Sequence, residues 1–213
     1  IYSVANDTVD TLVVFPRNAV GNVKPMREIN TPHGTFGIAV EEDAHELFLT
    51  VQHEHAMVVY RKEAVGTEKP LRRLEGLQTR LQDPHGIALD PKNGLVYVTN
   101  HGSVNERQKV GTGRFNPPSI TVYPIKAEGN TPPLRIIQGP KTLLNWPAAM
   151  AFDPEKDELY VANDGGDSLL VFGADDSGDV APRRVVSGAK TGIRNPTGLY
   201  LDLGIFDYSV ESR

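Results

Sequence analysis

The feature that most limits the possible folds of this chain is an internal repeat. Four similar short segments begin at Gly37, Gly86, Ala149 and Gly198. Successive starts lie 49, 63 and 49 residues apart, so the repeat is 49 residues long and one copy carries an insertion of 14 residues. The insertion falls within residues 102–118. A repeat of this length indicates a solenoid, a propeller or another array in which each unit packs on its neighbours.

Other positions recur in the same frame. In each copy a strand-like segment ends in an aromatic residue, which is followed after six residues by glycine and after twelve by arginine. The aromatic residues are Phe15, Tyr60, Tyr123 and Phe172, and the arginines are Arg27, Arg72, Arg135 and Arg184. Each complete copy contains four strand-like segments joined by turn-forming residues.

Four short strands in each repeat are typical of a β-propeller, in which small four-stranded antiparallel sheets, or blades, are arranged around an axis. In the first strand Gly86 and Ala88 alternate with bulkier residues, as expected where blades converge near the axis. Asn93 and Gly94 both tolerate positive φ, so they favour a tight turn between the first two strands. The arginine and a nearby proline on the last strand would protect an exposed sheet edge. We therefore predict an all-β propeller.

The repeat also predicts the domain organisation. We expect one propeller over residues 1–213, with a partial blade over 2–29, full blades over 37–74, 86–137 and 149–186, and a further inner strand over 198–202. These segments amount to about four blades. Either the last strand closes a four-bladed ring against residues 2–6, or the sequence is an arc of a six- or seven-bladed propeller, which we favour. An open arc would expose two apolar blade faces that missing blades or another chain would cover.

Charge and composition exclude some classes of function. The formal net charge is −5, and 22 basic and 27 acidic residues are interspersed, so no basic stripe is present for a phosphate backbone. We therefore expect no nucleic-acid partner. No apolar run approaches the 18 or so residues of a membrane span, and we expect none. The chain has no cysteine, which excludes disulfides and thiolate metal sites.

The motifs resemble the NHL and YVTN families of β-propeller proteins. Tyr97-Val98-Thr99-Asn100 spells the namesake motif of the second family, and the resemblance extends from Tyr2 to about Asp202. It implies a propeller. Separately, we expect an exported protein in an extracellular or periplasmic location. These families include scaffolds, cell-surface proteins, ligand binders and a minority of enzymes, so the resemblance leaves the activity open.

Histidines are predicted to gather at one end of the propeller. The loops that enter the inner strands and the loops between the second and third strands lie at the same end, and they carry His33, His53, His55, His85 and His101. Neutral imidazoles from successive blades can bind one divalent metal ion. Pro84-His85-Gly86 is similar to a metal-binding motif of propeller lyases of the peptidyl-amidating type, although two other repeats have Ala148 and Thr197 at the histidine position.

This second resemblance implies a divalent metal site, zinc or calcium, with His85 as a ligand and His33 as a partial second match, and we add His101 as a further candidate ligand. The alternative is that these histidines bond to neighbouring turns or face solvent. Candidates for binding a ligand or partner at the same end are His53, His55, Asn100, Arg107, Arg114, Phe115, Trp146 and Asp164. The arginines and Phe115 belong to the insertion, which the repeat needs least, and loops commonly carry the binding sites of a scaffold. Trp146 stacks on a ligand or packs between blades.

Three functions are compatible with these features. The first, which we favour, is a noncatalytic module that presents the histidine end to a protein or small ligand. The second is a metal-dependent lyase or lactonase that uses His85 with His33 or His101. The third is a structural cell-surface protein. The spacing of the imidazoles separates them, because zinc ligation requires nitrogens about 2.0–2.1 Å from a common centre.

Overall fold

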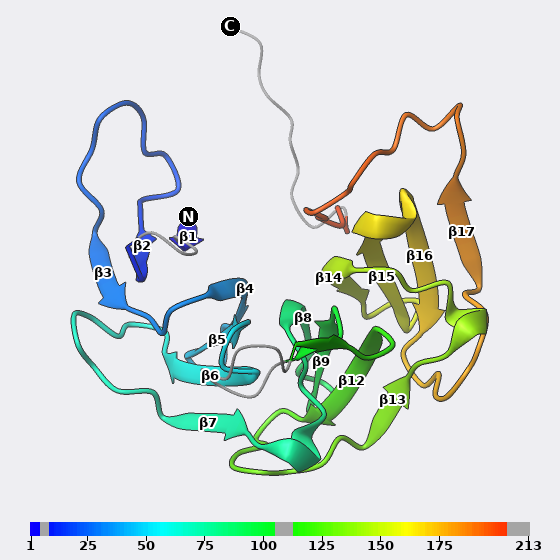
Figure 1. Cartoon of the computed structure of the whole chain (residues 1–213). Coiled ribbons are helices and arrows are strands. Elements are labelled where there is room, and N and C mark those ends of the chain that lie inside the picture. Colours follow the sequence, from blue (N-terminus) through cyan, green and yellow to red (C-terminus); the bar gives the residue numbers. More distant parts are fainter. Residues whose placement is uncertain (5–8, 105–112, 204–213) are drawn as a thin grey trace, which may run out of the picture.

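The computed structural model describes residues 1–4, 9–104 and 113–203 (Figure 1). The first sheet contains β1 (Tyr2–Val4), β2 (Thr11–Val14) and β3 (Arg27–Asn30). The second contains β4 (Thr35–Glu41), β5 (Glu46–Val51), β6 (Ala56–Arg61) and β7 (Arg72–Glu75). The third contains β8 (Pro84–Asp90), β9 (Leu95–Asn100), β12 (Ser119–Pro124) and β13 (Arg135–Ile137). The fourth contains β14 (Pro147–Asp153), β15 (Glu158–Asn163), β16 (Ser168–Gly173) and β17 (Arg184–Ser187).

The four sheets are blades of a β-propeller, as predicted. Within each sheet neighbouring strands are antiparallel and follow one another in chain order, except that β10 and β11 lie between β9 and β12 in the chain. The inner strands β4, β8 and β14 lie beside one another, and the sheets fan out from them as an arc that is open between the first and fourth sheets (Figure 1). The fold is therefore all-β and contains about four blades.

Glycine is required where the inner strands approach each other. A Cβ atom on Gly37 would lie 2.2 Å from the backbone oxygen of His85, and one on Gly86 would lie 2.2 Å from the oxygen of Ala148. Both positions would clash with backbone of the next blade. The small residues of the repeated first segment therefore set the distance between blades, as the sequence indicates.

Threonine hydroxyls connect neighbouring blades at the same depth. The Thr50 hydroxyl accepts a hydrogen bond from the Gly37 amide at 2.7 Å and donates to the His85 oxygen at 2.5 Å. The Thr99 hydroxyl accepts from the Gly86 amide and donates to the Ala148 oxygen, both at 2.7 Å. Each hydroxyl satisfies two buried backbone groups that belong to different blades.

The repeated arginines and glycines also join the blades, at their outer edges. Arg27, Arg72 and Arg135 donate to the backbone oxygens of Lys62, Ile125 and Ala174 in the following blade, at 2.5–2.9 Å. The outer strands form parallel bridges with the next blade at the pairs Ile29 and Gly66, Leu74 and Gly129, and Ile137 and Gly178. The repeated arginine thus has a structural role, but it links blades rather than only blocking an edge.

The fourth blade has no such neighbour among the described residues. Val186 occupies the position of Ile29, Leu74 and Ile137, whose exposed fractions are 0–2%, yet Val186 is 45% exposed. The predicted inner strand over 198–202 does not form, and these residues have no regular secondary structure. Each inner strand in this array pairs with the strand that follows it, and the described residues offer no such partner here. One blade face is therefore uncovered, as expected of an arc.

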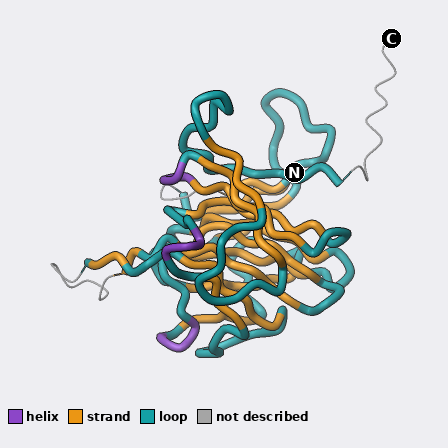
Figure 2. Tube along the Cα trace, turned by 90° about the vertical axis from the view of Figure 1, so that its right-hand side faces the viewer, coloured by secondary structure: helices purple, strands orange, loops and turns teal. Residues whose placement is uncertain are grey.

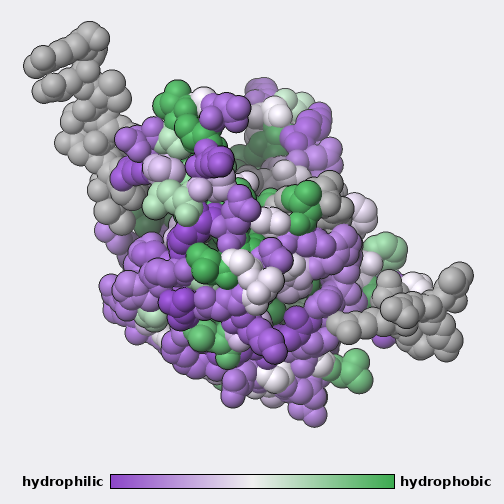
Figure 3. Space-filling view, turned by 90° about the vertical axis from the view of Figure 1, so that its left-hand side faces the viewer, coloured by the Kyte–Doolittle hydropathy of each residue, from purple (hydrophilic) through white to green (hydrophobic). Residues whose placement is uncertain are grey.

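The insertion forms a small hairpin outside the blades. Its strands β10 (Ser103–Val104) and β11 (Arg114–Phe115) pair with each other and project from the body of the molecule (Figure 2). Helical structure in the described residues is limited to three-residue 3-10 turns, and none of these helices could span a bilayer. The side of the molecule shown in Figure 3 is mainly hydrophilic, with apolar groups scattered over it.

Candidate functional site

A pocket of about 630 Å³ lies at the histidine end, between the second, third and fourth blades and the β10–β11 hairpin. Its volume falls within the range of small-molecule sites. The lining residues are Gln52, His53, His55, Asp83, His85, His101, Ser103, Val104, Phe115, Trp146 and Asp164. The structure thus brings together four of the five histidines that the sequence assigned to this end.

His85 is buried and its tautomer is determined by its neighbours. Its Nδ1 lies 3.0 Å from the backbone oxygen of Asp83, which only accepts, so Nδ1 carries the proton. Nε2 is then the acceptor, and it faces the side-chain nitrogen of Gln52. Burial lowers the pKa of His85, while the hydrogen bond to Asp83 opposes this shift. His85 is therefore a neutral imidazole with its lone pair oriented toward Gln52.

His101 lies in a stack of rings beside the pocket. Its ring is nearly parallel to that of His85, with centroids 3.4 Å apart, and also nearly parallel to that of Trp146, with centroids 5.6 Å apart. Burial lowers the pKa of His101 to about 3, so this imidazole is also neutral near pH 7. Its Nε2 is buried and has no hydrogen-bond partner in the described part of the chain.

Asp83 connects the histidines of two blades. Its amide donates to Nδ1 of His55 at 3.0 Å, and its carboxylate oxygens lie 3.6 Å from Nδ1 of His85 and 3.9 Å from Nδ1 of His101. Burial raises the pKa of Asp83 above its ordinary value, and the nearby histidines oppose this shift. Asp83 adopts a positive φ of 56°, which places it at the turn into β8.

Asp83, His85 and His101 form a possible metal-binding cluster. One ligand atom from each can be chosen so that all lie within 4.8 Å of one another. Ligands around tetrahedral zinc are about 3.3 Å apart, given metal–ligand distances of about 2.0–2.1 Å. The donor types suit zinc, but the parallel rings of His85 and His101 direct their lone pairs into parallel planes. The arrangement becomes that of a metal site only if His101 rotates out of the stack.

His33, which we predicted as a metal ligand, does not join this cluster. It is largely exposed, and its Nδ1 lies 2.9 Å from a carboxylate oxygen of Asp10. Its ring is 5.3 Å from that of His53, centroid to centroid. The hydrogen bond with Asp10, across the junction of the first and second blades, holds His33 at the rim of the pocket, and Asp83 takes the third place in the cluster.

The other predicted binding residues separate into two groups. Phe115, Trp146, Asp164, His53 and His55 line the pocket. Asn100 does not: it is fully buried, its side-chain oxygen accepts from Gln82 N at 3.0 Å, and its side-chain nitrogen donates to Thr121 at 3.0 Å. These contacts give Asn100 a structural role in the loop before β8.

The insertion contributes only in part. Arg114 lines a neighbouring pocket with Leu81, Gln82 and Val104 rather than the histidine pocket. Arg107 lies outside the described residues. Only Phe115, 72% exposed at the end of β11, represents the insertion's predicted binding residues in the histidine pocket.

Sequence reasoning missed Asp83 and Gln52. The repeated Pro-His-Gly pattern points to imidazole ligands and gives no sign that Asp83, two residues before His85, would join them. The positions were available, since Asp83 is in the loop that enters an inner strand and Gln52 follows the second strand of its blade, as His101 does. No sequence signal showed that Gln52 would face His85 across a blade boundary.

Comparisons with known proteins agree with this fold. Residues 81–110 match the family model of the NHL repeat. A chain of a nidogen/laminin complex has a TM-score of 0.57 and 19% identity, over 90% of this chain and 64% of that one. A candidate 6-phosphogluconolactonase of Bacteroides fragilis has a TM-score of 0.55 and 13% identity, over 88% and 50%. The periplasmic gluconolactonase of Pseudomonas aeruginosa has a TM-score of 0.52 and 20% identity, over 80% and 44%.

At these identities the structural similarity shows the fold alone. This chain spans less than two thirds of each of these three chains. The comparison with curated proteins gave no match. The NHL match over the third blade and the propeller architecture confirm the predicted resemblance: one NHL repeat is matched, and the fold is that of a β-propeller.

Proposed function

We propose that the chain is a noncatalytic binding module whose histidine pocket takes a small ligand with a planar, polar group. The observation that carries this proposal is the ring stack of His85, His101 and Trp146, which ends at a half-exposed tryptophan beside the pocket. Such a stack offers a flat surface to a further ring. The buried Nε2 of His101 and the carboxyl of Asp83 supply polar contacts beside it.

Trp146 is the only tryptophan, so its fluorescence reports on this pocket alone. We expect at least one planar polar probe, such as uracil or nicotinamide, to quench the fluorescence saturably. His101→Ala should weaken that binding by about tenfold or more, because it removes a ring contact and a buried polar group. His45→Ala, at the opposite end, serves as the matched control and should have no effect. Linear quenching alone, or equal binding by His101→Ala, would overturn the proposal.

A metal-dependent lyase or lactonase is the second candidate. It is supported by the cluster of Asp83, His85 and His101, and two of the similar structures carry lactonase names. Bound zinc would act as a Lewis acid on a substrate oxygen. Calorimetric titration with zinc should then give one site per chain that Asp83→Asn abolishes, together with hydrolysis of glucono-δ-lactone. Absence of zinc binding to the metal-free protein at pH 7.5 would rule this candidate out.

The location and the partners belong to the same proposal. We propose an exported protein in an extracellular or periplasmic location, supported by the periplasmic source of one similar structure. Further blades of a six- or seven-bladed ring, or another chain, would cover the exposed face around Val186. A protein partner at the histidine end and a purely structural role on the cell surface remain the alternatives. Capture of a partner that Trp146→Ala abolishes would favour the former over a small ligand.

A further inference from the structure

A second site emerges from a comparison of the blades with one another. In the second blade the carboxylate of Glu46 pairs with Arg72 through two hydrogen bonds of 2.7 and 2.8 Å. In the fourth blade Glu158 pairs with Arg184 through bonds of 2.8 and 2.6 Å. In both blades a carboxylate from the start of the second strand therefore binds the repeated arginine of the outer strand.

The fourth blade adds a tyrosine to this arrangement. The Tyr160 hydroxyl lies 3.0 Å from a carboxylate oxygen of Glu158 and 3.0 Å from Nη2 of Arg184. Tyrosine, glutamate and arginine thus form one hydrogen-bonded group, in which the carboxylate accepts from both the hydroxyl and the guanidinium.

The third blade keeps the tyrosine and the arginine and lacks the carboxylate. Strand pairing fixes the equivalence, because Leu95 lies opposite Pro124 as Glu158 lies opposite Gly173. Tyr97 and Arg135 then correspond to Tyr160 and Arg184. Leucine therefore occupies the position of the glutamate.

The consequence is a pair of donors without an acceptor. Tyr97 is fully buried and its hydroxyl lies beside the Arg135 guanidinium, but no described group accepts the proton of this hydroxyl. Arg135 donates from Nη2 to the Ala174 oxygen and forms no ion pair with any described carboxylate. Its buried Nε has no partner either, although this is also true of Arg72. The difference from the other blades is therefore the carboxylate, which would accept from both the hydroxyl and the guanidinium.

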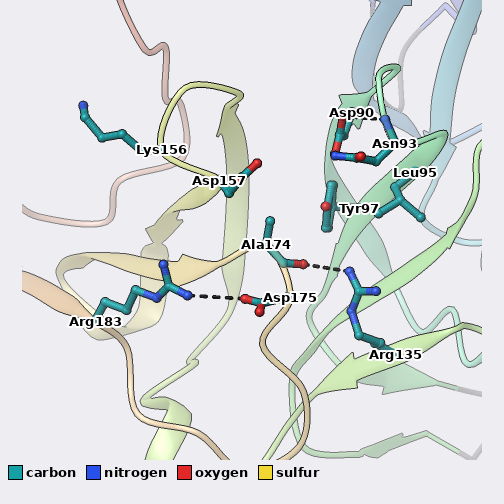
Figure 4. A pocket seen from close by; sticks show the side chains of 10 residues that line it. All are labelled: Asp90, Asn93, Leu95, Tyr97, Arg135, Lys156, Asp157, Ala174, Asp175 and Arg183. Carbon is teal, nitrogen blue, oxygen red and sulfur yellow. Dashed lines mark hydrogen bonds and ion pairs between the residues drawn. The ribbon is translucent and has the colours of Figure 1, made fainter.

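These two side chains line a pocket of about 500 Å³ between the third and fourth blades (Figure 4). It lies at the end of the propeller opposite the histidine pocket, beside the turn between β8 and β9. The remaining lining residues are Asp90, Asn93, Leu95, Lys156, Asp157, Ala174, Asp175 and Arg183. Three acidic and three basic residues balance in charge, so recognition depends on the local pair Arg135 and Tyr97.

We propose that this pocket binds a small carboxylate whose oxygens take the place of the missing glutamate, accepting from the Tyr97 hydroxyl and the Arg135 guanidinium. Leu95 and Ala174 would contact the aliphatic part of the ligand. Burial raises the pKa of Tyr97 to about 12, so the hydroxyl keeps its proton near neutral pH and remains a donor.

Three carboxylates of the chain itself line the pocket, those of Asp90, Asp157 and Asp175, and none of them forms an ion pair with Arg135 or accepts from Tyr97 in the described part of the chain. The oxygens of Asp90 accept from the backbone and side-chain nitrogens of Asn93 at 3.1 and 2.7 Å. Asp175 lies 3.3 Å from Arg183, and its side chain is 89% exposed (Figure 4). Asp175 is the internal competitor for Arg135, so its removal should leave binding intact or strengthen it.

The test is a titration with propionate, followed by the NMR signals of the Arg135 Nε–H group and the Tyr97 ring, with propionamide as the uncharged counterpart. We expect saturable shifts with propionate and none with propionamide. Leu95→Glu should abolish them, because its carboxylate would occupy the site as Glu158 does, whereas Leu95→Met preserves an apolar side chain of similar size and should retain them. Tyr97→Phe should weaken binding by about tenfold or more, since a hydrogen bond to a charged acceptor is lost.

Several results would overturn the proposal: equal shifts with propionamide, saturable binding that persists in Leu95→Glu, or no saturable shift in a folded chain. Asp175→Asn distinguishes a further outcome. If propionate binds only after this substitution, Asp175 itself fills the site and the pocket is not a ligand site in the unaltered protein. Folding of each variant is checked by its thermal unfolding before titration, and Leu95→Glu should unfold at a higher temperature because it satisfies both donors.

Discussion

Replacing Thr99 with valine removes a hydroxyl that joins the third blade to the fourth. This hydroxyl is fully buried, accepts from the Gly86 amide and donates to the Ala148 oxygen, both at 2.7 Å. Valine has nearly the same shape, so packing is retained and only the two hydrogen bonds are lost. The substitution therefore isolates one polar contact between blades.

The size of the effect follows from the two groups that lose their partner. Leaving a buried donor or acceptor unsatisfied costs about 1–3 kcal/mol. With two such groups, the free energy of unfolding should fall by about 2–6 kcal/mol in Thr99→Val. Thr50→Val should have a similar effect, because its hydroxyl joins Gly37 to His85 in the same way.

Urea unfolding followed by far-UV circular dichroism measures this change. Thr131→Val is the matched control, because the Thr131 hydroxyl bonds the Glu128 oxygen at the surface, and its effect should stay below about 0.5 kcal/mol. A loss in Thr99→Val as small as in Thr131→Val would refute the argument that threonine hydroxyls hold the blades together.

Acidification should destabilise the chain through His101, whose pKa is about 3 in the folded protein against an ordinary 6.5. The unfolded chain then binds the proton first as the pH falls. The contribution of His101 to the free energy of unfolding is therefore complete above pH 6.5 and declines by up to about 1.4 kcal/mol per pH unit toward pH 3. Urea midpoints of His101→Gln should vary less over that range, and a pH dependence equal to that of the unaltered chain would contradict the assignment. In the same assay, Glu46→Gln should lower the free energy of unfolding at pH 7 by about 2–4 kcal/mol, because it breaks the nearly buried ion pair with Arg72. A loss below about 0.5 kcal/mol would show that the pair does not stabilise the fold. Gly86→Ala should prevent folding or lower the melting temperature sharply, whereas Gly198→Ala, where an added Cβ meets no atom within 4 Å, should fold normally; similar melting temperatures for both would contradict the close approach of the inner strands.

Periodicity predicted the blades because each constraint recurs in every copy. The inner-strand position must hold a small residue wherever two blades meet. The spacing of the aromatic and arginine positions recurs because corresponding strands have nearly the same length in each blade. These are local rules that do not depend on which residue lies opposite. The prediction of an inner strand over 198–202 was wrong because a strand also needs a neighbouring strand to pair with, which a local sequence pattern does not provide.

Contacts between blades were harder to predict. The sequence shows that Arg72 recurs, but not that it reaches Ile125 in the next blade. In the same way, the sequence places His33 and His85 at one end of the propeller. It does not show that Asp10 holds His33 away from the cluster while Asp83 approaches His85. The partners of these side chains belong to adjacent repeats, so their identity depends on how two blades are rotated against each other.

The proposed carboxylate site in the third blade was also not predictable from the sequence. A leucine at residue 95 looks like an ordinary strand residue in the sequence. It becomes informative only when strand pairing shows that Glu46 and Glu158 occupy the equivalent positions and that each binds an arginine. A departure from the repeat is therefore a useful signal, but its chemistry is visible only in the structure.

The pocket at the histidine end is the proposed ligand-binding site of this chain. The most direct test is a 1H–15N correlation spectrum of the labelled chain, recorded with and without the planar probe that quenches Trp146. The account predicts shifts at the Trp146 indole and at the amides of Asp83, His101 and Ser103, which line the pocket. Shifts confined to the outer strands β3, β7 and β13, with these four signals unchanged, would contradict it.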